Sequence, residues 1–124
     1  MKKKVLVPFM VIALLIATAT TAFAATNPCT LNPDNKGEVK TAELVASRFH
    51  GAAYNQSYSK DNMMYKLQAY KGEWRKVEER PITLGEYYAT PQPLNADPAM
   101  RVRTKLWSRL GEGGVTGVGS VCDF

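Results

Sequence analysis

The stretch MMYKLQAYKGEWRKVEE, residues 63–79, decides how much of this chain is expected to form sheet. Its apolar and aromatic positions 65, 67 and 69 alternate with Lys66, Gln68 and Tyr70, which is the period of a strand with one buried face. A glycine-containing turn at residues 71–73 then leads into a second strand from Trp74. The residue types also suit a helix over residues 62–71. We favour the hairpin because Gly72 lies where a turn is needed.

Residues 97–110 fit two patterns at once. Asp97-Pro98 is a favourable helix start, an N-cap followed by proline at the first helical position. Val102, Leu106 and Leu110 then recur at every fourth residue, as on one face of a helix. The same segment alternates between apolar and basic residues from position 100 to 106, as a strand does. The cap favours the helix, and the strand remains the alternative.

Two further elements complete the expected fold. Residues 41–50 place Leu44, Val45 and Phe49 near one helical face, and Gly51 would end that helix. Residues 118–124 are expected to return as a strand beside Cys29. Together these patterns predict a single small α+β domain over residues 25–124, with one or two helices and a short antiparallel sheet.

Residues 1–24 have the three parts of a cleavable signal peptide. Lys2, Lys3 and Lys4 form a positive start, residues 5–17 are largely apolar, and Ala22-Phe23-Ala24 is a small-x-small cleavage site. The apolar run is shorter than the roughly 20 residues needed to span a bilayer. The sequence therefore predicts an exported protein, periplasmic in a bacterium or, alternatively, secreted.

Cleavage would also change the charge of the protein. The whole chain has 16 Lys and Arg against 11 Asp and Glu, and three of the lysines lie in the leader. The remaining 13 basic residues leave a net charge of about +2, so bulk charge no longer indicates a nucleic-acid partner.

Cys29 and Cys122 are the only cysteines, and they lie near the two ends of the exported part. In an oxidising compartment such a pair predicts a disulfide. Closing a loop of about 94 residues would stabilise the fold by roughly 4 to 5 kcal/mol on the chain-entropy model. The spacing fits neither a redox pair nor a structural zinc site, and we expect no metal and no cofactor.

The most concentrated basic feature is the stripe Arg101, Arg103 and Lys105, with Trp107 beyond it. These residues share one face if the segment is a strand and spread over a wide arc if it is a helix. Trp107 and Trp74 are candidate anchors, because tryptophan is enriched at binding hot spots. The five residues are the predicted partner-binding set. The expected partner is a protein, anionic lipid is an alternative, and nucleic acid is disfavoured by the compartment.

No catalytic constellation stands out. His50 is the only histidine, and Ser47, Ser57 and Asp61 are near it only in sequence. Glu78 and Glu79 are adjacent, so on a strand they point to opposite faces and cannot form a catalytic carboxylate pair. We therefore expect a non-enzymatic binding or accessory protein of the bacterial cell envelope. The alternatives are a small secreted hydrolase or toxin that uses His50, and a lipid-binding protein.

Overall fold

The computed structural model describes residues 25–123, and in this part of the chain every regular element is a β-strand. In chain order these are β1 (Thr26–Leu31), β2 (Val39–Lys40), β3 (Leu44–Asn55), β4 (Met63–Tyr70), β5 (Trp74–Ile82), β6 (Tyr87–Ala89), β7 (Leu94–Ser108) and β8 (Gly117–Asp123). All pairings are antiparallel. The predicted α+β class is therefore wrong, and the fold is all-β.

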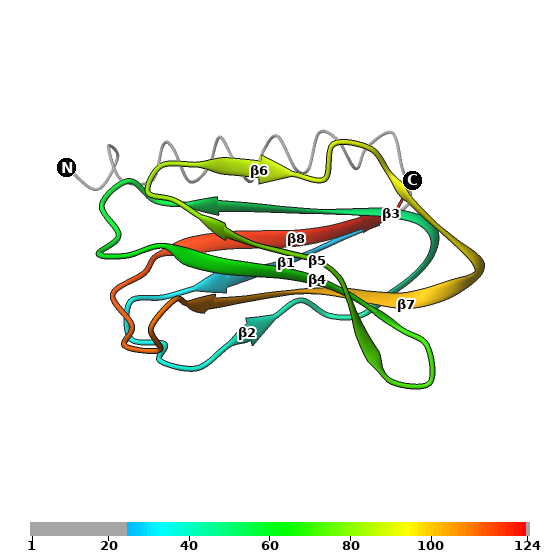
Figure 1. The fold of residues 1–124 in the computed structure, drawn as a ribbon, viewed down its shortest axis with the longest axis horizontal. Helices are drawn as coiled ribbons and strands as arrows, with labels where there is room; N and C mark the ends of the chain where they lie inside the picture. The colour runs from blue at the N-terminus through cyan, green and yellow to red at the C-terminus, as the bar shows by residue number, and fades with distance from the viewer. Residues whose placement is uncertain (1–24, 124) are drawn as a thin grey trace.

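The strands follow the order β1-β8-β3-β7-β4-β5, with β2 added to β7 and β6 added to β3. The long strand β7 links two parts of this sheet. Its first half pairs with β3, and its second half pairs with β4 and β2. Figure 1 shows β6 and β3 along one side of the molecule and β7 and β2 along the other.

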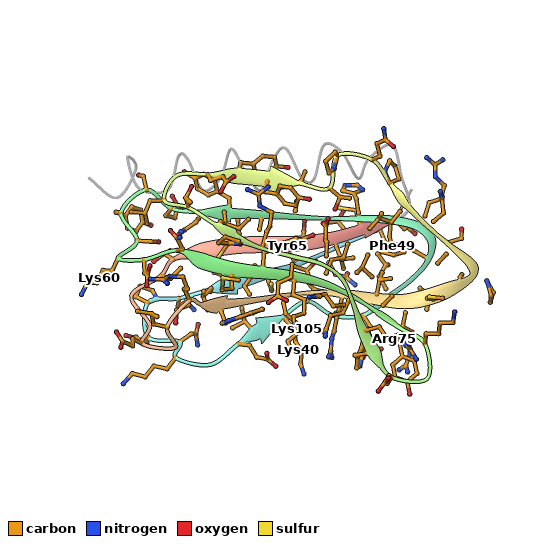
Figure 2. All side chains as sticks on the ribbon, in the orientation of Figure 1. Lys40, Phe49, Lys60, Tyr65, Arg75 and Lys105 are labelled. Atoms are coloured by element: carbon orange, nitrogen blue, oxygen red, sulfur yellow. The ribbon has the colours of Figure 1, made fainter. Side chains whose placement is uncertain are left out.

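Large side chains of β4 and β7 reach across to glycines of β3 and β8. The site of a Cβ on Gly51 is taken by the Tyr65 hydroxyl, and that on Gly117 by the Met63 sulfur. A Cβ on Gly119 would lie 3.0 Å from a methyl group of Leu106. The side chains from β4 and β7 therefore come close to the backbone of β3 and β8, because the glycines have no side chains at these contacts. Figure 2 shows Tyr65 in the middle of this packing.

The predicted hairpin is confirmed. β4 and β5 pair from Met63 with Ile82 to Tyr70 with Trp74, with one register shift after Leu67. The Lys71 amide donates to the Glu73 carbonyl at 2.8 Å across the turn, and Gly72 has a φ of 76°. Such a backbone conformation favours glycine, and the presence of Gly72 at this position was the reason for favouring the hairpin.

The helix predicted from Asp97 is wrong, and the strand alternative is the observed one. Val102, Thr104, Leu106 and Ser108 of β7 are buried, and the residues between them lie on the outer side. Pro98 fits because the pairing of β7 with β3 shifts register between Asn95 and Met100. A proline is tolerated at such a break because no ladder hydrogen bond is lost there.

The helix predicted for residues 41–50 is also wrong. The segment from Leu44 onward belongs to β3, which continues through Gly51 to Asn55 and pairs with β6, β7 and β8. Gly51 is not a helix cap, since its lack of a side chain makes room for Tyr65. The return strand predicted at 118–124 is confirmed as β8, which pairs Gly119 with Cys29 of β1.

The predicted disulfide between Cys29 and Cys122 is wrong, and both thiols are free. Cys29 lies opposite Gly119, and Cys122 lies opposite Thr26, so the two cysteines are offset by three residues along paired strands. At about 3.4 Å per residue the offset is roughly 10 Å, and an odd offset puts the side chains on opposite faces. A disulfide requires Cα atoms within about 7 Å.

We expect the protein, unfolded without reductant, to take up two alkyl groups per chain. In the folded protein Cys29 should react slowly at pH 8, because burial raises the pKa of its thiol to about 12 and leaves little thiolate. Mass spectrometry after iodoacetamide treatment measures both quantities. A chain that resists alkylation until reductant is added would contradict the free thiols.

The predicted signal peptide falls on residues 1–24, outside the described residues, and stays a prediction. Between residues 25 and 123 we find no helix with the length and apolarity to cross a membrane.

Candidate functional site

The predicted partner-binding residues gather on one surface. Because β7 is a strand, Arg101, Arg103, Lys105 and Trp107 alternate with its buried residues and lie on the outer side. Residues of β2, β4 and β5 join them through cross-strand pairs. We define the basic face as Lys40, Lys66, Tyr70, Trp74, Arg101, Arg103, Lys105 and Trp107.

Three lysines form a row across the centre of the basic face. Lys105 of β7 lies directly opposite Lys40 of β2 on one side and Lys66 of β4 on the other. Figure 2 shows the side chains of Lys40 and Lys105 next to each other. Like charges directly opposite each other in a sheet destabilise it. The fold therefore keeps this row at a cost in free energy.

Acidic residues compensate only part of this charge. The Lys105 ammonium, with a side chain 13% exposed, lies 2.7 Å from the Glu38 carboxylate, and this hydrogen bond lowers the pKa of Glu38. Glu79 is opposite Lys66, but its nearest cation is Lys76 at 3.5 Å. Among the described residues, no carboxylate lies within 4.0 Å of the ammonium groups of Lys40 or Lys66.

The two arginines of the basic face lie over aromatic rings. The Arg101 guanidinium lies 4.0 Å from the centre of the Tyr70 ring, and that of Arg103 lies 3.9 Å from Trp74. The two rings pack edge to face, with centres 5.3 Å apart. At the other end of the face the Lys66 ammonium lies 5.4 Å from the Trp107 ring. Cation–π contacts of this kind fix the direction of charged groups that would otherwise rotate freely.

Sequence patterns had not singled out three members of the basic face. Lys66 and Tyr70 belong to the alternating pattern from which the hairpin was predicted. That pattern was enough to infer that their side chains lie on the outer side of β4. No sequence signal pointed to Lys40, because β2 is only two residues long and its partner is remote in the chain.

A second polar cluster surrounds Glu78 on the inner side of β5. One carboxylate oxygen accepts hydrogen bonds from Tyr65 and Thr90, each at 2.7 Å, and the other accepts one from Tyr88 at 2.9 Å. Burial, reinforced by Glu78, raises the pKa of Tyr65, so its hydroxyl stays a donor. The cluster links β4, β5 and β6, and its polar groups form hydrogen bonds with one another. Such an arrangement is typical of a network that stabilises the fold.

His50 and Asp61 lie in different segments of the fold. His50 is in the middle of β3 opposite Cys122, between the inward-facing Phe49 and Gly51. Asp61 lies in the loop after β3, where its carboxylate accepts hydrogen bonds from the Asn62 amide at 2.7 Å and from Arg109 at 3.3 Å. The alternative of a small secreted hydrolase or toxin that uses His50 stays a prediction.

No protein family model matches the sequence, and no curated protein is similar to it in sequence. Among solved structures, PirA has a similar fold, with a TM-score of 0.50 and 12% identity over 78% of this chain and 91% of PirA. A mitogen from Yersinia pseudotuberculosis gives a TM-score of 0.49 and 13% identity, covering 81% of this chain and 85% of that one. The prophage-derived protein YomS gives 0.41 and 10%, covering 81% and 96%. The similarity to PirA supports the fold alone.

Proposed function

We propose that this protein is a non-enzymatic binding protein that docks an acidic protein partner on the basic face. The row Lys40–Lys105–Lys66 is the observation that carries the proposal. Neighbouring like charges weaken the free fold, and a partner that brings carboxylates to the row relieves the repulsion. The energy thereby released adds to the affinity of the complex.

The aromatic residues of the basic face favour a specific protein interface over nonspecific attraction of anions to a positively charged surface. Protein interfaces are enriched in tryptophan, tyrosine and arginine, which together carry much of the binding energy. Here Tyr70 and Trp74 already hold Arg101 and Arg103 in place. Less side-chain entropy is therefore lost when a partner binds.

Acidic residues around the basic face favour a protein partner over an anionic membrane. Glu38 lies against Lys105, Glu43 lies 3.2 Å from Arg101, and Glu79 lies opposite Lys66. A planar anionic bilayer would meet these carboxylates as well as the cations. A protein surface with both signs of charge can match them.

The affinity of the purified protein for a synthetic polyglutamate chain tests the proposal. We expect Lys66→Glu to weaken binding by about tenfold at about 0.1 M salt, since it reverses a charge within the row. Lys60→Glu is the control, because it makes the same change at the end of the molecule where β3 joins β4 (Figure 2). Its affinity should stay within about twofold of the unchanged protein.

Two results would count against the proposal. Equal losses of affinity in Lys66→Glu and Lys60→Glu would show that polyglutamate responds to the net charge of the protein and does not bind at the basic face. Binding to phosphatidylglycerol vesicles but not to polyglutamate, with the vesicle binding sensitive to Lys66→Glu, would assign the face to lipid.

A further inference from the structure

We propose that Arg103 is the anchor of the basic face and takes a carboxylate of the partner on its two terminal nitrogens, with Gln68 as the residue that positions it. This inference rests on the proposed function and names the group that the partner must present. Arg103 belongs to the outer side of β7, and Gln68 lies directly opposite it on β4.

The Arg103 guanidinium is held on two sides. Its Nε donates to the Gln68 side-chain oxygen at 2.9 Å, and its central carbon lies 3.9 Å from the centre of the Trp74 ring. Gln68 is itself only 7% exposed, so it is a fixed acceptor. The orientation of the guanidinium is therefore set before any ligand arrives.

Among the described residues, Arg103 differs from four of the other arginines in having no carboxylate at ion-pair distance. Carboxylates lie within 4.0 Å of Arg75, Arg80, Arg101 and Arg109. Within residues 25–123 no carboxylate lies that close to Arg103. The Glu38 carboxylate acts on Arg103 through its charge but forms no ion pair with it. A half-buried, oriented guanidinium with no carboxylate at ion-pair distance in this part of the chain is arranged to receive one from outside.

The geometry selects the binding mode. Arginine binds carboxylates best through two parallel N–H···O bonds. Because Nε already donates to Gln68, the remaining fork is the pair of terminal nitrogens. A lysine at this position would keep the charge but lose the fork. Lys66 lies two residues from Gln68 on β4, about 7 Å along the strand, and has no carboxylate within 4.0 Å among the described residues, so it can meet a second acidic group.

The test compares Arg103→Lys with Arg109→Lys in the polyglutamate assay. We expect Arg103→Lys to weaken binding by about tenfold, because a charge-assisted two-point contact is lost while the net charge is kept. Arg109→Lys is the matched control, since it makes the same change outside the basic face and its guanidinium already has Asp61 as a partner. Its effect should stay within about twofold.

Nitrogen-15 NMR of the arginine side chains gives a second readout that does not depend on the variants. In the unchanged protein, polyglutamate should shift the terminal-nitrogen signals of Arg103 more than those of Arg101. A parallel titration with inorganic polyphosphate separates carboxylate recognition from general anion binding. Tighter binding of polyphosphate, with the same Arg103 shifts, would overturn the assignment to a carboxylate.

The failures of the two proposals differ. If Lys66→Glu weakens binding and Arg103→Lys does not, and the Arg103 signals stay in place, the basic face binds acidic partners but Arg103 is not its anchor. If neither variant changes the affinity, both proposals fall.

Discussion

Gly51→Ala is expected to lower the free energy of unfolding by about 3 kcal/mol, the upper part of the usual range for overpacking a core. The new methyl group would overlap the Tyr65 hydroxyl and lie 3.1 Å from the adjacent ring carbon and 3.2 Å from the Thr104 hydroxyl. Tyr65 is fully buried, and its hydroxyl is hydrogen-bonded to Glu78 at 2.7 Å. The ring therefore has no room to move without breaking that bond.

Urea unfolding of Gly51→Ala beside Gly37→Ala measures this effect. Gly37 has no atom within 4 Å of the position of a new Cβ, so its substitution reports the effect of alanine on the unfolded chain alone. The midpoint for Gly51→Ala should fall well below that for Gly37→Ala. Equal midpoints would mean that β3 and β4 do not pack against each other as described.

Glu78→Ala is expected to lower the free energy of unfolding by about 2 to 3 kcal/mol. The carboxylate accepts hydrogen bonds from Tyr65, Tyr88 and Thr90, and its removal leaves the buried Tyr65 hydroxyl without its acceptor. An unsatisfied buried donor costs about 1 to 3 kcal/mol, and bonds to a charged acceptor lie at the upper end.

Glu79→Ala is the matched control for Glu78→Ala. Glu79 is the next residue on β5, exposed, and paired only with Lys76 at 3.5 Å, so its removal should change stability by less than about 0.5 kcal/mol. Thermal and urea unfolding of the two variants give the comparison. Similar losses in both would refute the role assigned to the Glu78 cluster.

Local signals predicted some elements of the fold and misled on others. The hairpin over residues 63–79 was predictable because Gly72 and the alternation on both sides of it are features of that segment itself. At Asp97-Pro98 the local signal favoured a helix, whereas pairing of β7 with β3 and β4 imposes a strand. Tertiary pairing outweighs helix capping because β7 has partners along both edges.

The glycines illustrate what a local pattern leaves out. In the sequence Gly51 follows the segment predicted to be a helix, where a helix cap is expected. In the structure its lack of a side chain leaves room for Tyr65, a residue on another strand. The disulfide was predicted from the oxidising compartment and from the presence of only two cysteines. In the pairing of β1 with β8, however, Cys29 lies opposite Gly119, three residues away from Cys122. Neither close packing nor register can be read from the residues near these positions.

The candidate site was predictable in part. The alternation in residues 100–106 was enough to place Arg101, Arg103 and Lys105 on one face if the segment was a strand. The lysine row was not predictable, because it depends on the registers of β2 and β4 against β7. The stacking of Arg103 on Trp74 depends on the same registers.

Intrinsic fluorescence tests the central claim most directly, because both tryptophans of the chain, Trp74 and Trp107, belong to the basic face. The protein is titrated with dye-labelled polyglutamate, whose anisotropy reports binding independently. We predict that the tryptophan emission of Trp74→Phe and of Trp107→Phe each changes in step with the anisotropy, and that salt reverses both signals. Saturable binding with unchanged tryptophan emission would place the ligand elsewhere and contradict the basic face as the binding site.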